Sequence, residues 1–156
     1  MLKIEHLTKS YGDRSAVSDL SLHIKKGEIY GFIGHNGAGK TTTIRSCAGI
    51  LRFDAGKVYI DGISVKEKPL ECKKLTAYIP DNPDLYEFYM GIKYLNFIAD
   101  IYSIPQGERE QKVKKYADLF ELTSDFGRLI GAYSHGMKQK LAVISALIHS
   151  PLAYIL

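Results

Sequence analysis

The chain has 156 residues, of which 46% are hydrophobic and 24% are charged, the balance of one globular domain with a real core. The net charge of +4 is mild and its basic clusters are short and interrupted, which favours solvated surface charge over a nucleic-acid footprint. No run is long enough to span a membrane and no signal peptide opens the chain, while two cysteines without metal-ligand spacing favour free thiols in a reducing cytoplasm.

Strands dominate the first part of the chain. Apolar residues that alternate with polar ones predict strands over residues 2–7 and 17–24, with a turn at 10–14 between them. A second turn at Lys26-Gly27 leads into residues 28–33, whose apolar character predicts a buried strand.

Residues 34–41 read Gly-His-Asn-Gly-Ala-Gly-Lys-Thr, the G-x-x-x-x-G-K-T pattern of a phosphate-binding loop. The glycines let the backbone curl until successive amide N–H groups point into one nest that suits an anion. Lys40 adds positive charge where the β- and γ-phosphates should lie, and Thr41 offers a hydroxyl to Mg²⁺. Residues 41–51 have helical spacing, and the order strand, loop, helix aims a helix N-terminus at phosphate.

Shorter elements follow this predicted helix. After a loop at residues 54–56, residues 57–65 predict a hairpin around Asp61-Gly62, because Asp-Gly between two apolar runs favours a type I′ turn. Further along we expect a short helix, a short strand and a loop, over residues 69–74, 76–79 and 81–83.

The remainder is mostly helical. Two helices are predicted within residues 91–129, separated by a break at 105–107. A loop at 131–136 precedes a third helix that runs to about Ser150. The apolar run 152–156 suits a strand buried on both faces.

A second motif lies at residues 133–140, Tyr-Ser-His-Gly-Met-Lys-Gln-Lys. Ser134 and Gly136 open a helix whose first amides have no partner within the helix, and such a start is a second anion site. Taken alone, the motif favours an ordinary helix capped by Ser134, with Met137 in the core.

Taken together, the two motifs resemble those of the ATP-binding cassette (ABC) family. The family signature L-S-G-G-Q matches residues 133–137, and its basic-Gln-basic tail matches 138–140. The resemblance covers essentially the whole chain and implies an α/β P-loop NTPase core with a mixed or parallel sheet, an N-terminal antiparallel β subdomain and an inserted helical subdomain. It divides the chain into a nucleotide-binding core, a helical subdomain, and the signature helix with the Walker B strand, at residues 1–90, 91–131 and 132–156.

The same resemblance implies roles for individual residues. Tyr11, which alone would be a turn residue that packs, matches the aromatic residue that stacks on adenine. ATP would be bound by the phosphate loop, Gly34, His35, Asn36, Gly37, Ala38, Gly39, Lys40, Thr41 and Thr42. Ser134 and Gly136 would contact ATP held by a second cassette. Asp81 falls at the Q-loop, where with Lys40 it would act in catalysis and with Thr41 hold Mg²⁺; alternatively it is a turn residue before Asn82-Pro83.

Three departures from the family pattern stand out. His135 and Met137 replace signature residues, and Asp81 stands where glutamine is usual. The chain stops at Leu156, before the Asp and Glu that follow the Walker B strand. We interpret it as a truncated cassette that lacks its C-terminal part, binds nucleotide weakly and hydrolyses it negligibly.

For the intact parent, the resemblance implies an ATPase subunit at the cytoplasmic face of a bacterial membrane. Two such cassettes would form a head-to-tail dimer and couple ATP to transport by a separate transmembrane permease. The Y-S-x-G-M-K-Q variant of the signature looks like that of bacterial exporters. The alternatives are a cassette ATPase acting in translation or DNA repair, a small P-loop kinase, and a regulatory nucleotide-binding module.

Overall fold

The computed structural model describes residues 1–83 and 85–156, which form two compact units. Unit 1 comprises Met1–Ala77 with Ile155, and unit 2 comprises Tyr78–Tyr154 with Leu156. Apolar side chains of the strands form the core of the first unit, whereas apolar side chains of the helices form the core of the second. The finer division at residues 90 and 131 stays a prediction.

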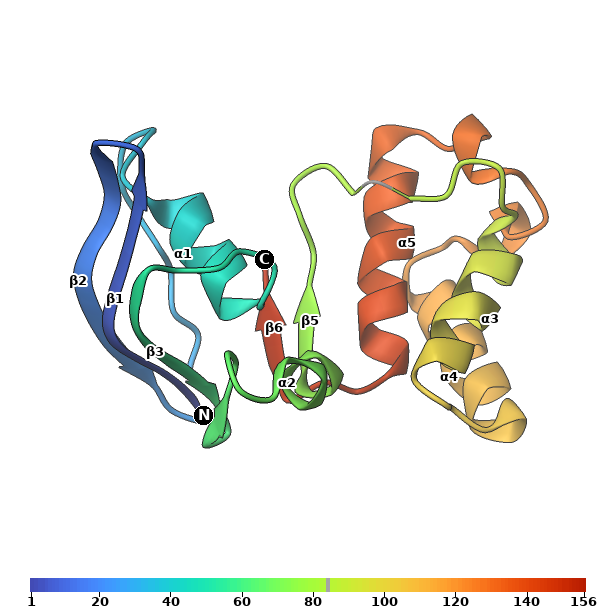
Figure 1. The fold of residues 1–156 in the computed structure, drawn as a ribbon. Helices are drawn as coiled ribbons and strands as arrows, with labels where there is room; N and C mark the ends of the chain where they lie inside the picture. The colour runs from blue at the N-terminus through green and yellow to red at the C-terminus, as the bar shows by residue number, and fades with distance from the viewer. Residues whose placement is uncertain (84) are drawn as a thin grey trace. The chain divides into compact units, whose positions relative to one another are not determined.

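Unit 1 is built on a four-stranded antiparallel sheet in the order β2-β1-β3-β4 (Figure 1). In β3 the alternate residues Val58 and Ile60 are buried, as the period of a strand requires. In β1 the buried residues Ile4 and Leu7 are three positions apart, because the pairing register shifts between them. The four strands are β1 (Leu2–Tyr11), β2 (Arg14–Ile24), β3 (Ala55–Ile60) and β4 (Ile63–Ser64).

Each of the two hairpins of this sheet has a turn of two residues. The predicted turn at residues 10–14 contracts to Gly12-Asp13, because Tyr11 and Arg14 already pair across the strands. Asp61 and Gly62 have φ angles of 50° and 82°, both positive as a type I′ turn requires. The predicted Asp-Gly turn is therefore confirmed, whereas the predicted loop at 54–56 is wrong after its first residue because β3 begins at Ala55.

Helix α1 (Lys40–Cys47) packs against β2 and β3 of the sheet. It is shorter than the predicted helix of residues 41–51, since Gly49 takes a left-handed φ of 66° and ends the helical path. The predicted short helix and short strand are confirmed as α2 (Pro69–Leu75) and β5 (Thr76–Tyr78).

The prediction of a buried strand over residues 28–33 is wrong. The structure assigns no strand there, and the side chains of Ile29 and Ile33 are fully exposed. Among the described residues, the backbone of this segment makes one hydrogen bond to other backbone, from Glu28 N to Lys25 O at 3.3 Å. A strand exists only where a second strand satisfies its N–H and C=O groups, and an apolar run says nothing about that partner.

Unit 2 consists mainly of three helices that pack against one another (Figure 1). They are α3 (Gly91–Ile101), α4 (Gln106–Leu119) and α5 (His135–Ile148), with the 3₁₀ turns η1 (Thr123–Asp125) and η2 (Ile130–Ala132). The predicted helical section is confirmed, but α4 already begins at Gln106, since Pro105 fits the position before a first turn. Throughout the described residues, no helix is both long and apolar enough to cross a bilayer.

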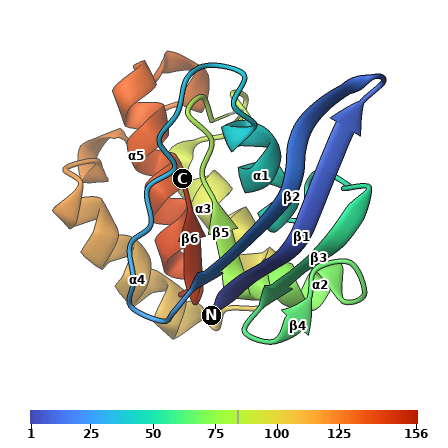
Figure 2. The same cartoon turned by 90° about the vertical axis from the view of Figure 1, so that its left-hand side faces the viewer.

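The last strand is β6 (Ala153–Ile155), which joins β5 in a two-stranded sheet (Figure 2). The predicted strand is confirmed, but its burial on both faces is wrong. Ile155 is buried while Tyr154 is 46% exposed. Successive side chains of a strand point to opposite faces, so one face of β6 is covered and the other is open.

The core of unit 2 gives a direct test of this packing. Leu141 of α5 is 0% exposed, whereas Leu119 at the end of α4 is 67% exposed. We expect Leu141→Ala to lower the free energy of unfolding by about 2–5 kcal/mol, because it leaves a cavity, and Leu119→Ala by less than about 0.5 kcal/mol. Urea denaturation followed by circular dichroism measures both, and equal losses would contradict the core described above.

Candidate nucleotide-binding site

The predicted phosphate loop is curled, with two glycines in the left-handed region. Gly37 and Gly39 have φ angles of 85° and 81°. Between them Ala38 N donates to His35 O at 3.2 Å, which closes a turn. Gly39 is also the N-cap of α1, and its carbonyl accepts the first bond of the helix, from Thr43 N at 2.9 Å. The loop thus ends directly in a helix N-terminus.

Gly39 cannot be exchanged for a larger residue without moving its surroundings. A Cβ at this position would collide with the main-chain oxygen of Ala16 and lie 3.1 Å from Cγ2 of Val17. The left-handed backbone is itself costly for residues that have a Cβ. Close packing against β2 therefore requires glycine here, independently of any ligand.

The main-chain amides at this end of the loop are open. Among the described residues, no backbone acceptor is found for five of them, the N–H groups of Gly37, Gly39, Lys40, Thr41 and Thr42. The first amides of a helix have no partner within it and carry the positive end of its dipole. The geometry therefore suits a phosphate group.

Lys40 lies on the rim of the same loop. Its Nζ donates to the main-chain oxygens of Gly34 at 2.5 Å and His35 at 2.9 Å. The ring of His35 lies at the exposed edge, with Nδ1 2.9 Å from the main-chain oxygen of Asn36. The ammonium group therefore lies against the main chain at the start of the loop, whereas the open amides are at the end that leads into α1.

The same end of α1 carries the candidate Mg²⁺ ligand. Thr41 is exposed in the first turn of α1, the turn whose amides are open. No group of three His, Cys, Asp or Glu side chains that could hold a metal occurs in the described residues. Mg²⁺ keeps several waters and takes one or two protein ligands beside substrate phosphates. A single hydroxyl beside a phosphate loop therefore fits a Mg²⁺ ion that is bound together with a nucleotide.

Tyr11 ends β1, with its side chain 53% exposed. The Nζ atom of Lys9 lies 5.4 Å from the centroid of the Tyr11 ring, a cation–π arrangement. An exposed ring of this kind offers surface on which a base can stack.

Both cysteines are buried free thiols, in agreement with the prediction of free thiols. Burial raises the pKa of the Cys47 thiol to about 12, so the residue is a neutral thiol at physiological pH. Cys47 therefore acts as a packing residue of α1, not as a nucleophile or a metal ligand.

The signature residues lie in unit 2, where α5 begins. Ser134 is the N-cap, and its Oγ accepts from Met137 N at 3.3 Å, as the sequence predicted. Gly136 is exposed, with open space around it. Just before the cap, the buried Tyr133 donates its hydroxyl to Asp125 O at 2.7 Å, which anchors the start of the helix.

Asp81, the proposed Q-loop residue, lies near the first turns of the same helix. Its side chain is exposed, and its main-chain oxygen accepts from Gln139 Nε2 at 2.7 Å. Six residues further on, Glu87 Oε1 accepts from Lys138 Nζ at 2.5 Å. We call these two contacts the clamp. Sequence reasoning used Lys138 and Gln139 as part of the signature tail and missed their contacts with Glu87 and Asp81, because no local pattern reports a bond across fifty residues.

The predicted site residues therefore fall into two sets. Tyr11 and residues 34–42 belong to unit 1, whereas Asp81, Ser134 and Gly136 belong to unit 2. Within unit 2 the clamp connects Asp81 to the helix that Ser134 caps.

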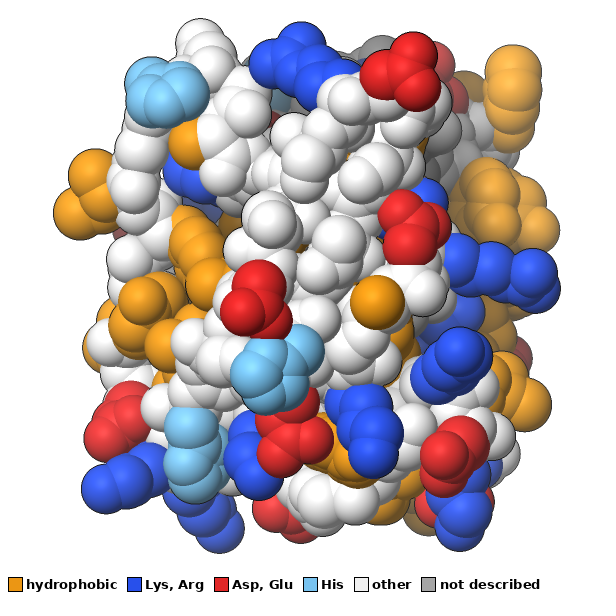
Figure 3. Space-filling view, turned by 60° about the vertical axis from the view of Figure 1, so that its left-hand side comes forward, with side chains coloured by type: hydrophobic (Ala, Val, Ile, Leu, Met, Phe, Trp, Pro, Cys, Tyr) orange, Lys and Arg blue, Asp and Glu red, His pale blue; other side chains and the backbone are white. Residues whose placement is uncertain are grey.

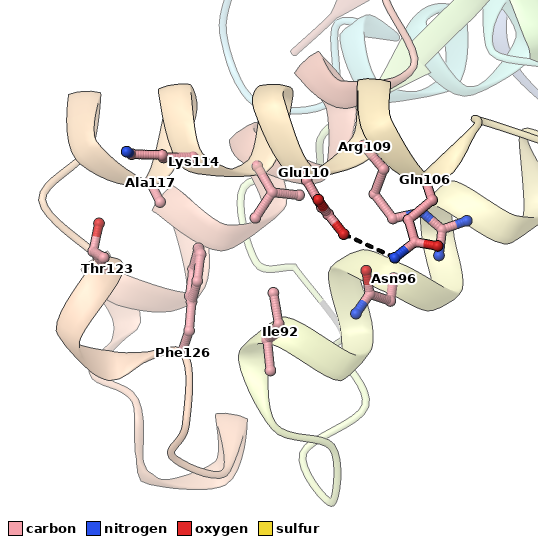
Figure 4. A pocket seen from close by; sticks show the side chains of 10 residues that line it. Ile92, Asn96, Gln106, Arg109, Glu110, Lys114, Ala117, Thr123 and Phe126 are labelled. Carbon is pink, nitrogen blue, oxygen red and sulfur yellow. Dashed lines mark hydrogen bonds between the residues drawn. The ribbon is translucent and has the colours of Figure 1, made fainter.

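A separate hollow of about 690 Å³ lies within unit 2, beside α3 and α4 (Figure 4). Gln106 Nε2 donates to Glu110 Oε1 at 2.9 Å along its rim. Its lining consists of Ile92, Asn96, Gln106, Arg109, Glu110, Val113, Lys114, Ala117, Thr123 and Phe126. It contains none of the predicted site residues and no glycine loop, so we assign it no part in nucleotide binding.

Comparison with known families shows to which family the chain belongs. The family model described as ABC transporter matches residues 17–156, which include the phosphate loop and the signature. The chain belongs to the ABC transporter family. The resemblance inferred from the two motifs is thereby confirmed, together with the α/β fold that it implied.

Two curated relatives are named as ATP-binding proteins of ABC transporters or of peptide export. The chain is 36% identical over 156 residues to the uncharacterized ABC transporter ATP-binding protein YhcH of Bacillus subtilis (strain 168), covering 100% of this chain and 50% of YhcH. It is 34% identical over 158 residues to the SkfA peptide export ATP-binding protein SkfE of the same organism, covering 100% of this chain and 64% of SkfE.

A solved structure shares the fold. It is titled as the ATP binding subunit of an ABC transporter and superposes with a TM-score of 0.93 at 29% identity, covering 99% of this chain and 64% of that one. The chain thus spans about half to two thirds of the length of these three proteins.

The phosphate loop yields a stability prediction with a matched control. Gly12 also has a positive φ, 57°, but a Cβ there would meet nothing within 4 Å. We expect Gly12→Ala to lower the free energy of unfolding by about 1 kcal/mol through backbone strain. Gly39→Ala should cost about 1–3 kcal/mol more, because its Cβ also collides with the carbonyl of Ala16. Chemical denaturation measures both free energies of unfolding. Equal losses in the two variants would show that the contact between Ala16 and residue 39 is not rigid.

The clamp yields a second prediction. Glu87→Lys places two cations together, and we expect it to reduce the free energy of unfolding of unit 2 by about 0.5–1 kcal/mol. The double variant with Lys138→Glu should regain most of this loss, because the ion pair is restored with reversed polarity.

Hydrogen exchange of the Gly131 amide, which donates to Glu87 O, provides a local readout, and the exposed Lys93→Glu is the charge control. If the double variant is no more protected than Glu87→Lys, the ion pair does not hold this segment.

Proposed function

We propose that this chain is the ATP-binding part of an ABC transporter and that it binds ATP through residues 34–42. One observation carries the proposal: the loop curls through two left-handed glycines, Gly37 and Gly39, into the open N-terminus of α1. The ammonium of Lys40 lies on its rim. A triphosphate is the ligand whose charge and reach match both the amides and the cation.

The chemistry we propose is positioning and charge neutralisation, which dominate phosphoryl transfer. Lys40 and the loop amides would stabilise the charge that builds on the transferred group. Thr41 would bind the Mg²⁺ that accompanies the nucleotide. Asp81 would ligate this ion or orient the attacking water, and its exposed carboxylate leaves both roles open.

Adenine and a second cassette complete the proposed site. Tyr11 would stack on the adenine ring, which its exposure supports. Ser134 and Gly136 would contact the ATP of a second cassette in a head-to-tail dimer. The exposed first turn of α5 and the open space at Gly136 support this role.

A transmembrane permease is the proposed partner, and an aromatic patch on unit 2 is its proposed contact. This aromatic patch consists of Tyr86, Phe88, Tyr89, Met90 and Leu129. Phe88 is 92% exposed, and exposed apolar groups that cluster in this way mark interaction surfaces. A hollow of about 440 Å³ opens among Phe88, Tyr89, Met90, Lys93 and Leu129. The clamp connects this patch to α5, a route by which the permease would sense ATP.

We further propose export as the direction of transport, at the cytoplasmic face of a bacterial membrane. SkfE is a SkfA peptide export ATP-binding protein, which supports export, as does the Y-S-x-G-M-K-Q form of the signature. A role in translation or DNA repair is the alternative. On the face shown in Figure 3, acidic and basic side chains are interspersed, which does not favour a nucleic-acid partner.

The test of this function is a titration of the chain with a fluorescent ATP analogue in the presence of Mg²⁺. We expect saturable binding, weakened at least about tenfold by Lys40→Ala because a charge-assisted contact to phosphate is lost. Lys57→Ala, which removes an exposed lysine of the same unit, is the control variant.

Phosphate release measured on the same samples tests the ATPase. We propose that appreciable turnover belongs to the whole protein, since the chain spans half to two thirds of its relatives. Turnover at the rate of a full-length relative, abolished by Lys40→Ala, would contradict the proposed inactivity. Co-purification with ribosomes or DNA instead of a membrane protein would contradict the transport function.

A further inference from the structure

A second cation lies beside the phosphate loop, outside the glycine-lysine-threonine motif. A Cβ at Gly37 would lie 3.3 Å from Nη2 of Arg14, so the guanidinium is close to the main chain in the middle of the loop. Arg14 is the first residue of β2. Figures 1 and 2 show the tip of the β1–β2 hairpin and the loop before α1 at the same end of unit 1.

The tight hairpin places Arg14 there. Because the turn is Gly12-Asp13, Arg14 pairs directly with Tyr11. The two residues therefore lie opposite each other at the tip, and both are exposed.

The side-chain donors of Arg14 have no partner among the described residues. Arg109 and Arg128 form ion pairs with Asp100 and Asp125, whereas no hydrogen bond or ion pair joins the side chain of Arg14 to another described residue. A guanidinium has five N–H donors in a rigid fork, is charged at every physiological pH and matches the oxygens of a phosphate in pairs. Its donors are therefore available at the loop, where an anion is expected.

We infer that Arg14 is a nucleotide-binding residue that contacts the phosphate chain. This inference rests on the function proposed above and deepens it. Lys40 lies at the Gly34–His35 side of the loop, whereas Arg14 reaches it at Gly37. The triphosphate is thus bound between two cations from distant parts of the sequence, and the hairpin tip holds both ends of the nucleotide, the base through Tyr11 and the phosphates through Arg14.

The experiment compares the affinities of Arg14→Gln and of unaltered chain for adenosine, AMP, ADP and ATP, by competition against the fluorescent ATP analogue. We expect roughly a tenfold loss of ATP affinity, because charge-assisted hydrogen bonds are removed, a smaller loss for AMP, and no change for adenosine. Arg14→Lys should recover part of the affinity, since it restores charge without the fork. Arg45→Gln removes the same charge from the exposed last turn of α1 and should leave binding unchanged.

Two outcomes overturn the inference. The first is equal ATP affinity in Arg14→Gln and Arg45→Gln. The second is that Arg14→Gln weakens the binding of adenosine as much as that of ATP, which would mean that it acts through the hairpin and Tyr11. Both leave the proposed function intact as long as Lys40→Ala loses ATP. If Lys40→Ala and unaltered chain bind equally, it is instead the proposed function that fails. Circular dichroism of each variant confirms that the fold is retained.

Discussion

The close approach of β2 to the phosphate loop is the constraint on which the candidate site depends. The main-chain oxygen of Ala16 occupies the space that a side chain at Gly39 would need. That contact admits glycine alone and keeps residue 39 in its left-handed conformation. Because Gly39 caps α1, the same contact determines where the helix starts and where its open amides point. A packing constraint in the sheet thus becomes the geometry of an anion site.

In unit 2, a single helix connects two surfaces with different chemistry. The first turn of α5 presents Ser134 and Gly136, the residues we propose for contact with nucleotide. One turn later, Lys138 and Gln139 bond to the segment that carries Asp81 and leads to the aromatic patch. Since a helix is stiff along its axis, displacement of that segment must move the signature residues or break the clamp. This is the physical form that communication between permease and ATP would take.

Sequence periodicity predicted the elements whose hydrogen bonds are local or close in the chain. The type I′ turn at Asp61-Gly62, the three helices of unit 2 and the cap at Ser134 all follow from patterns of a few residues. The strand at residues 28–33 failed because pairing depends on a partner that composition does not reveal. The same reason explains Tyr154, whose apolar neighbours suggested burial although one face of β6 is open.

The sequence by itself determined the family and predicted the residues of the candidate site. Eight residues with a fixed spacing are enough to predict a phosphate loop, because such a loop needs a flexible backbone and one positive charge within a short segment. Only the tertiary structure decided that Arg14 reaches Gly37 and that Gln139 bonds to Asp81. These contacts join residues 23 and 58 positions apart, and such distances are set by the packing of whole elements, about which a local pattern carries no information.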